Sequence, residues 1–232
     1  FGRLVRLSGR RARTESPESP KEIMPQTAAQ SRPEAATRKG ELQRERILEA
    51  AAGQFLADGY AAASVRSIAD AAGIGPSTLY HYFASKEDIL VAVHEEGLKR
   101  IQAALVAALE GVEAPSASPW GRLETACVAH LEALLEGGLI FRAVMREMPS
   151  VFDRDALERI RVTRDNYERI FARLLDDLSL PRGTDRHELR LMLLGSLNWA
   201  FTWYRPGRST PAQLAQTFVG FLKTQLQVDP PA

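Results

Sequence analysis

The chain has 232 residues, of which 45% are hydrophobic and 25% charged, and its net charge is +1. This composition is typical of a soluble globular protein, and no apolar run approaches the roughly 18 residues that a membrane span requires. The basic first residues are not followed by the apolar segment of a secretory signal, and the single cysteine, Cys127, excludes an internal disulfide. We therefore expect a cytoplasmic protein that does not enter a membrane.

Residues 1–38 are basic and contain few apolar side chains. They hold eight Arg or Lys residues and four Glu residues, a net charge of +4. A segment with so little to bury is expected to be a disordered tail. Residues 39–90, where a helical pattern begins, hold five basic and seven acidic residues, a net charge of −2.

The first helix is predicted before Gly59, where apolar residues recur with the period of a helix. This stripe is formed by Ile47, Leu48, Ala51, Ala52, Phe55 and Leu56. Two short helices joined by a tight turn are predicted next, because Ser64 is a favourable N-cap, Gly73 can end a helix and Gly75-Pro76 can begin one. This order of elements predicts a helix-turn-helix DNA reader, whose second helix enters the major groove.

The same residues resemble a known family. The segments IADAAGI (68–74) and STLYHYFASKED (77–88) are similar to the N-terminal domain of the TetR family of bacterial transcription regulators. The resemblance runs from about Arg44 to Leu90, and Gly75, Ser77 and Tyr82 depart from the family's usual residues. The residues expected to contact DNA are Ser64, Arg66, Pro76, Ser77, Thr78, Tyr80, His81, Tyr82 and Lys86.

These residues have different expected roles. Thr78 and His81 should face base edges in the major groove. The resemblance implies phosphate contacts for Tyr80 and Tyr82, and we expect Lys86, at the start of the next helix, to clamp the DNA backbone. The basic tail could add backbone contacts, although a solvated leader is the alternative.

Beyond the reader, the sequence predicts only helices. A long helix is expected over residues 86–110, followed by a Pro-, Ser- and Gly-containing break over 111–121. Further helices are expected over about 123–135, 139–147, 155–178, 186–204 and 211–226. We therefore expect an all-α fold with a disordered tail (1–38), a helix-turn-helix domain (39–85) and a ligand-binding and dimerisation domain (86–228).

The last two expected helices suggest a homodimer. Residues 189–204 are apolar on nearly every side, which is typical of a helix that is buried all round. Two such helices from each subunit could form a four-helix interface, and the TetR resemblance implies this kind of dimer; a single-chain core is the alternative. A two-fold dimer would read a palindromic operator in double-stranded DNA.

A tryptophan pair suggests a ligand site. Trp199 and Trp203 share one helix face, and Asn198 and Thr202 add polar groups to it. Core or interface anchoring is the alternative for both tryptophans. The segment from Leu197 to Leu222 is similar to the C-terminal region of TetR-family regulators that respond to acyl-CoA thioesters. This second resemblance implies an acyl-CoA effector and control of fatty- or aromatic-acid catabolism; a regulator of efflux that senses hydrophobic drugs is the alternative.

An acyl-CoA effector needs an apolar tunnel for its chain and cations for its phosphates. Met145 and Phe171 are among the apolar residues that could line the tunnel. Arg142 and Arg146 lie one turn apart on a short expected helix and could bind phosphate, with ion pairing to nearby glutamates as the alternative.

Catalysis finds little support in the sequence. The four histidines show no metal-type spacing, and no nucleophile elbow or Gly-rich phosphate loop is present. His130 in the bundle could contact a ligand, but we expect it to be a hydrogen-bonded core histidine. We therefore expect no metal, cofactor or enzymatic activity, and interpret the chain as a DNA-binding regulator, most simply a repressor, that a small hydrophobic effector releases from its operator. A non-DNA helical interaction or enzymatic bundle is the other class of interpretation.

Overall fold

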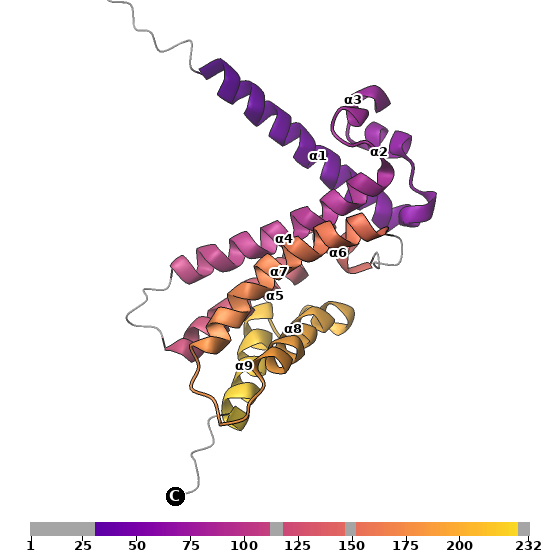
Figure 1. The fold of residues 1–232 in the computed structure, drawn as a ribbon. Helices are drawn as coiled ribbons and strands as arrows, with labels where there is room; N and C mark the ends of the chain where they lie inside the picture. The colour runs from indigo at the N-terminus through magenta and orange to yellow at the C-terminus, as the bar shows by residue number, and fades with distance from the viewer. Residues whose placement is uncertain (1–30, 112–117, 147–151, 227–232) are drawn as a thin grey trace, which may run out of the picture. The chain divides into compact units, whose positions relative to one another are not determined.

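A computed structural model of the chain describes residues 31–111, 118–146 and 152–226 (Figure 1). Within these ranges every regular element is a helix and no strand occurs, so the expected all-α fold is confirmed. The helices are α1 (Ser31–Ala62), α2 (Val65–Ala71), α3 (Pro76–Tyr80), α4 (Lys86–Glu110), α5 (Pro119–Glu136), α6 (Leu139–Arg146), α7 (Arg154–Asp176), α8 (Arg186–Trp203) and α9 (Pro211–Leu226). None of these helices has both the length and the apolar character that a membrane crossing demands.

The chain divides into two compact units, Phe1–Gly40 and Glu41–Ala232. Most of the expected tail lies outside the described residues, but its last part is helical, because α1 begins at Ser31. The domain boundary expected after residue 38 therefore falls within α1, and the expected tail stays a prediction. Near its other end, α1 is interrupted at Gly59, whose φ of 78° is not helical.

One hydrophobic core lies behind the reader. The apolar stripe of α1 packs with buried residues of α2, α3 and the first half of α4, among them Ile68, Leu79 and Leu90. The N-terminal half of α4 is apolar on several sides because it is surrounded by these helices. Residues from further along the chain complete this core: Ile140 and Ala143 of α6, Phe152, and Ala156 of α7.

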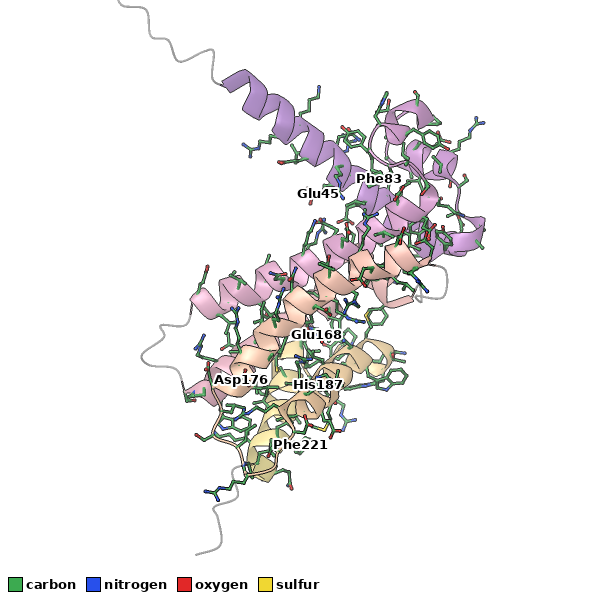
Figure 2. The ribbon with its side chains drawn as sticks, in the orientation of Figure 1. Glu45, Phe83, Glu168, Asp176, His187 and Phe221 are labelled. Carbon is green, nitrogen blue, oxygen red and sulfur yellow. The ribbon has the colours of Figure 1, made fainter. Side chains whose placement is uncertain are left out.

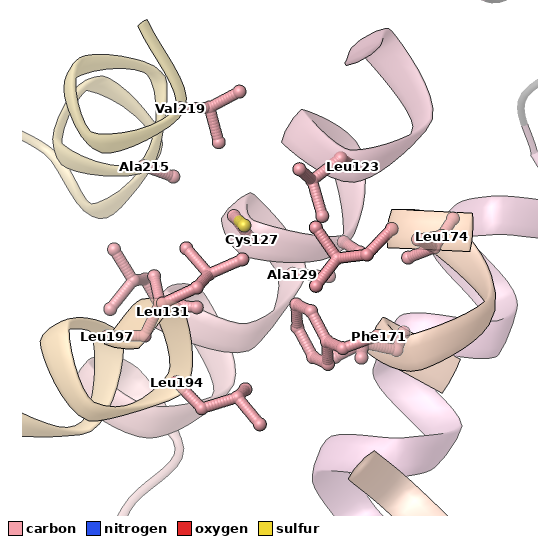
Figure 3. Close-up of a cluster of buried hydrophobic side chains, with 14 of the residues drawn as sticks. Leu123, Cys127, Ala129, Leu131, Phe171, Leu174, Leu194, Leu197, Ala215 and Val219 are labelled. Atoms are coloured by element: carbon pink, nitrogen blue, oxygen red, sulfur yellow. The ribbon is translucent and has the colours of Figure 1, made fainter. Parts of the chain in front are cut away.

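A second core fills the helical bundle around α5. This helix contacts α4, α6, α7, α8 and α9, so it is the central element of the bundle. Figure 3 shows Cys127 and Leu131 of α5 with Phe171 and Leu174 of α7 on one side, and with Leu194, Leu197, Ala215 and Val219 of α8 and α9 on the other. Cys127 is buried here. Burial raises the pKa of its thiol, so the thiol stays protonated.

Candidate functional site

The geometry of the turn between α2 and α3 follows from two local features. The Ser64 hydroxyl accepts a hydrogen bond from the Ser67 backbone N–H (3.0 Å), and the Ser67 hydroxyl accepts one from the Ser64 N–H (3.1 Å). This reciprocal pair fixes the start of α2. At the other end Gly73 adopts a φ of 69°, a conformation that other residues rarely reach, and the Ile74 N–H donates to the Ala69 carbonyl (3.0 Å). The two helices therefore meet at a fixed angle.

The short helix α3 is held by one side and exposed on the other. Leu79 is its only buried residue, and it belongs to the core behind the reader. Pro76 occupies the first helical position, where a missing N–H is tolerated. Every other residue of α3 is exposed, as is the capping His81, and the Tyr80 side chain is 56% exposed. The residues expected to read base edges, Thr78 and His81, are thus both available to a ligand.

Two cations lie near this surface. Arg66 on α2 is exposed. The Arg44 guanidinium carbon lies 5.5 Å from the centre of the Phe83 ring, which follows α3, and so is held beside the reader by a cation–π contact. Tyr82 is half-buried. Figure 2 labels Phe83, together with Glu45 on α1.

Several acidic residues of segment 39–90 contact groups outside that segment. Arg100 of α4 binds Glu45 (3.1 Å) and Glu49 (2.6 Å) of α1, and also Glu96 of its own helix (2.9 Å). One guanidinium therefore joins α1 to α4 and neutralises part of the negative charge of the reader.

Two more acids are engaged by α7 and the residue before it. Glu87 accepts a hydrogen bond from the Asp153 N–H (3.0 Å), and Asp88 lies 3.4 Å from the Arg159 guanidinium. Four of the seven acidic residues in segment 39–90 thus contact groups outside that segment. The net charge of −2 therefore overstates the negative charge that this segment presents to a nucleic acid.

Lys86, whose contact with DNA stays a prediction, makes several hydrogen bonds within the protein. Its ammonium donates to the carbonyls of Tyr60 (2.7 Å), Ala61 (3.3 Å) and Ala63 (2.9 Å), and it lies 4.4 Å from the centre of the Tyr60 ring. An ammonium has three protons, so these carbonyls use its whole donor capacity. Lys86 thus caps the C-terminal end of α1, where a positive charge also favours the helix dipole. A local sequence pattern cannot reveal these hydrogen bonds, because the three carbonyls lie more than twenty residues from Lys86 in the sequence.

The residues expected to bind an effector do not form one site. Trp199, Thr202 and Trp203 lie on the exposed side of α8, with exposed fractions of 64% for Trp199 and 45% for Trp203. The two tryptophans border a groove of about 360 Å³ together with Phe218 and Phe221 of α9. We call this surface the α8–α9 face and define it by Met192, Leu193, Ser196, Trp199, Trp203, Phe218, Phe221 and Leu222.

Four other expected ligand residues do not line that groove. Phe171 is fully buried in the bundle core, and Asn198 is half-buried on α8. Arg142 is exposed on α6 and forms no ion pair with a described residue, whereas Met145 is half-buried. The side chain of Arg146 lies outside the described residues.

The bundle core contains a polar pair that the sequence analysis did not anticipate. His130 of α5 is 1% exposed, and its Nδ1 lies 2.7 Å from the hydroxyl of Tyr167 on α7. Burial lowers the pKa of His130 to about 4, and a weaker interaction with Asn198 opposes this shift. Burial also raises the pKa of Tyr167. Both groups are therefore neutral near pH 7, and the expectation of a hydrogen-bonded core histidine is confirmed for Nδ1 alone.

A capped two-helix turn with an exposed second helix, set on a helical bundle, defines a helix-turn-helix DNA-binding regulator. Two family comparisons agree with this class. Residues 47–93 match the bacterial regulatory proteins of the tetR family, and residues 116–226 match the tetracyclin repressor-like C-terminal domain. The chain belongs to the TetR family. It is a transcriptional regulator and not an enzyme.

Individual relatives support the same assignment. The HTH-type transcriptional repressor KstR2 of Mycobacterium tuberculosis is 29% identical over 182 residues, which cover 76% of this chain and 86% of the relative. The TetR family transcriptional regulator PfmR from Thermus thermophilus is 30% identical, with a TM-score of 0.63 over 76% of this chain and 96% of PfmR. AibR in complex with isovaleryl coenzyme A and operator DNA has the same fold, with 23% identity and a TM-score of 0.65 over 77% of this chain and 97% of AibR.

Proposed function

We propose that this protein is a homodimeric repressor that binds a palindromic operator and is released from it by a small hydrophobic effector, most simply an acyl-CoA thioester. The observation that carries the DNA-binding part is the exposure of α3 around its single buried anchor, Leu79. Thr78 and His81 would contact base edges, while Ser64, Arg66, Ser77, Tyr80 and Tyr82 would contact phosphates or position the helix. Lys86 would act by holding α1.

The α8–α9 face supports the homodimer. Trp199 and Phe221 are 64% and 66% exposed, which is unusual for large apolar side chains that lie together on one surface. Phe221 is labelled on α9 in Figure 2. A second copy related by a two-fold axis would cover this face with the same face, and would place two reading helices about 34–36 Å apart or somewhat more.

The oligomeric state tests this interface directly. We expect the double variant Trp199→Ser, Phe221→Ser to be monomeric at micromolar concentration by light scattering, while the parent chain is a dimer. Val162→Ser is the matched control, because Val162 is a 52% exposed apolar residue of α7 that lies outside the α8–α9 face. A double variant that stays dimeric would contradict the assignment of this face.

Two observations support an acyl-CoA effector. AibR, which shares this fold, was crystallised with isovaleryl coenzyme A. Within this chain, the bundle core offers the apolar side chains that an acyl chain needs, and Arg142 has no carboxylate partner among the described residues. By linkage, the effector can release DNA only to the extent that it binds the DNA-free conformation more tightly. The controlled genes would then serve fatty- or aromatic-acid breakdown.

Operator binding measured by fluorescence anisotropy tests this proposal. The complex would be titrated with free CoA, isovaleryl-CoA, a long-chain acyl-CoA, phenylacetyl-CoA and the matching free acids. Release by one thioester, but not by its free acid or by CoA, is the expected result. Binding that is tight and indifferent to every thioester would leave the DNA-binding function and remove the acyl-CoA effector.

A second candidate is a regulator of efflux that senses hydrophobic drugs. It is favoured by the groove of about 360 Å³ between Trp199, Trp203 and Phe218, which would suit a flat aromatic compound. Release of the operator by neutral, CoA-free amphiphiles would support this candidate. Loss of that response in the Trp203→Ser variant, with the dimer intact, would place the drug in the groove.

A further inference from the structure

His130 sits in an apolar environment with only one of its ring nitrogens satisfied. Its ring packs edge-on against Phe171 (6.2 Å between centroids) and beside Tyr167 (5.8 Å). Nδ1 is bonded to the Tyr167 hydroxyl, whereas the fully buried Nε2 makes no hydrogen bond of ordinary geometry with a described residue, although a hydrogen-bonding interaction with the Asn198 side chain raises the pKa of the ring. A buried polar group without a partner costs about 1–3 kcal/mol, so proteins rarely keep one without a use for it.

The Tyr167 contact determines which nitrogen carries the proton. A neutral imidazole has one N–H, and a protonated phenol has one O–H. If the phenol donates to Nδ1, the only unsatisfied group is the N–H of Nε2. If instead Nδ1 donates to the phenol oxygen, both the phenol proton and the Nε2 lone pair lack partners. The first arrangement leaves fewer unsatisfied groups, so Nε2 is an unpaired donor.

We propose that the Nε2–H of His130 is the hydrogen-bond donor for a neutral acceptor oxygen of the effector, such as the carbonyl of a thioester or a ketone. This inference rests on the proposed function in one respect, namely that the effector enters the bundle core. The surrounding side chains, among them Phe171, Leu131 and Leu197, are apolar and buried. A carboxylate would be costly there because no described cation faces His130, so a neutral carbonyl compound fits better than its free acid.

Asn198 and Tyr167 would help to position this donor. The half-buried Asn198 of α8 raises the pKa of His130 through a hydrogen-bonding interaction, so the effector's oxygen would take over or share this role at Nε2. Tyr167 acts through the imidazole, because its hydroxyl holds the tautomer that has Nε2 protonated. Tyr167 is thus a positioning residue for the effector's oxygen.

The test uses the full-length protein and two small probes of matched shape. Cyclohexanone has a carbonyl oxygen where methylenecyclohexane has a CH₂ group, so the pair differs only in the acceptor. We would record the imidazole ¹⁵N–¹H correlations of the protein at millimolar concentrations of each probe. We expect the His130 signal to be that of the Nε2–H tautomer, to shift with cyclohexanone and to stay in place with methylenecyclohexane. Equal shifts with both probes, or none with either, would overturn the proposal.

Three variants separate binding from folding. His130→Leu removes the Nε2 donor but also leaves the buried Tyr167 hydroxyl without its partner, so the two effects on the melting temperature oppose each other, while the stabilisation by cyclohexanone should be lost. His94→Leu is the matched control, because His94 is also a buried histidine with an unpartnered Nε2 but packs against Phe152 of the other core; it should keep the response. Tyr167→Phe should weaken the response and let both tautomers appear in the ¹⁵N spectrum. A full cyclohexanone response in His130→Leu would overturn the proposal.

The outcome is independent of the acyl-CoA titration. If no thioester releases the operator but cyclohexanone engages His130, the donor is supported and the acyl-CoA class alone is lost. If isovaleryl-CoA releases the operator without moving the His130 signal, the proposed function stands and the assignment of His130 falls.

Discussion

Replacing Lys86 with Met separates a structural role from a DNA-contact role. The substitution keeps the length of the side chain but removes the three hydrogen bonds to the carbonyls of Tyr60, Ala61 and Ala63. The Tyr60 and Ala63 bonds are partly buried, so their acceptors regain water only in part. Two such losses of about 1–2 kcal/mol each, with about 0.5 kcal/mol from the cation–π contact to Tyr60, predict a destabilisation of about 2.5–4.5 kcal/mol.

The salt dependence of operator binding shows which role is correct. Each phosphate contact contributes about 0.9 to the slope of log K against log salt concentration, so a contact repeated in both subunits of a dimer would contribute about 1.8. Because the Lys86 ammonium is already saturated, we expect Lys86→Met to leave this slope within about 0.5 of the parent value. Operator affinity would fall only as far as the reader becomes less well ordered.

Arg66→Met is the matched control for this experiment. Arg66 is exposed on α2 and has no ion-pair partner among the described residues, so its loss should change the free energy of unfolding by less than about 0.5 kcal/mol. It should instead lower the salt slope by about 1.8. The operator would be selected from randomised duplex DNA, and both variants measured by anisotropy between about 50 and 300 mM salt and by urea unfolding. If Lys86→Met kept its stability and lowered the slope as Arg66→Met does, the capping role would be refuted.

Two substitutions and one pH titration test other contacts. His81→Ala should change the order of preference among operator variants, measured by competition binding, and an equal loss for every variant would speak against base contact. Gly97→Ala should lower the free energy of unfolding in urea by about 1–3 kcal/mol, because the new Cβ would lie 3.0 Å from a Val144 methyl between α4 and α6. Gly40→Ala is the control: its Cβ meets no neighbour, so it should not destabilise the fold. Stability should be full above about pH 7.5 and fall by roughly 2 kcal/mol per histidine between about pH 7.5 and 5.0, because burial lowers the pKa of both His94 and His130 to about 4 and the unfolded chain then binds more protons; His130→Leu should remove about half of this loss.

The sequence predicts the helices of this protein well because each one repeats an apolar residue with helical period or begins at a capping residue. The long helix over 86–110 and the last helix over 211–226 coincide with α4 and α9. The reader is equally visible, because Ser64, Gly73 and Pro76 act within a few residues of their own position. These are local effects, so the neighbouring residues contain all the necessary information.

Contacts between helices that lie far apart in the sequence cannot be read from local sequence patterns. Lys86 is a basic residue at the start of a helix, as a phosphate ligand would be, yet the carbonyls that its ammonium binds lie at the end of α1. The acids of the reader likewise look unfavourable for DNA binding until Arg100 and Arg159 are seen to engage them. His130 looks like an ordinary core residue, because only the tertiary structure shows that one of its nitrogens has a partner and that the other has none among the described residues.

At the α8–α9 face, the burial that the sequence predicts differs from the burial in the single chain. Residues 189–204 are apolar on nearly all sides, which predicts burial on all sides, but the single chain buries only one side and leaves Trp199 64% exposed. An effector in the groove of about 360 Å³ would cover the ring faces of a few residues and leave Leu191, at 50% exposure and outside the groove, in water. A second copy of the chain could cover the groove and Leu191 together. The extent of the apolar pattern therefore favours the dimer over the ligand as the reason for this surface.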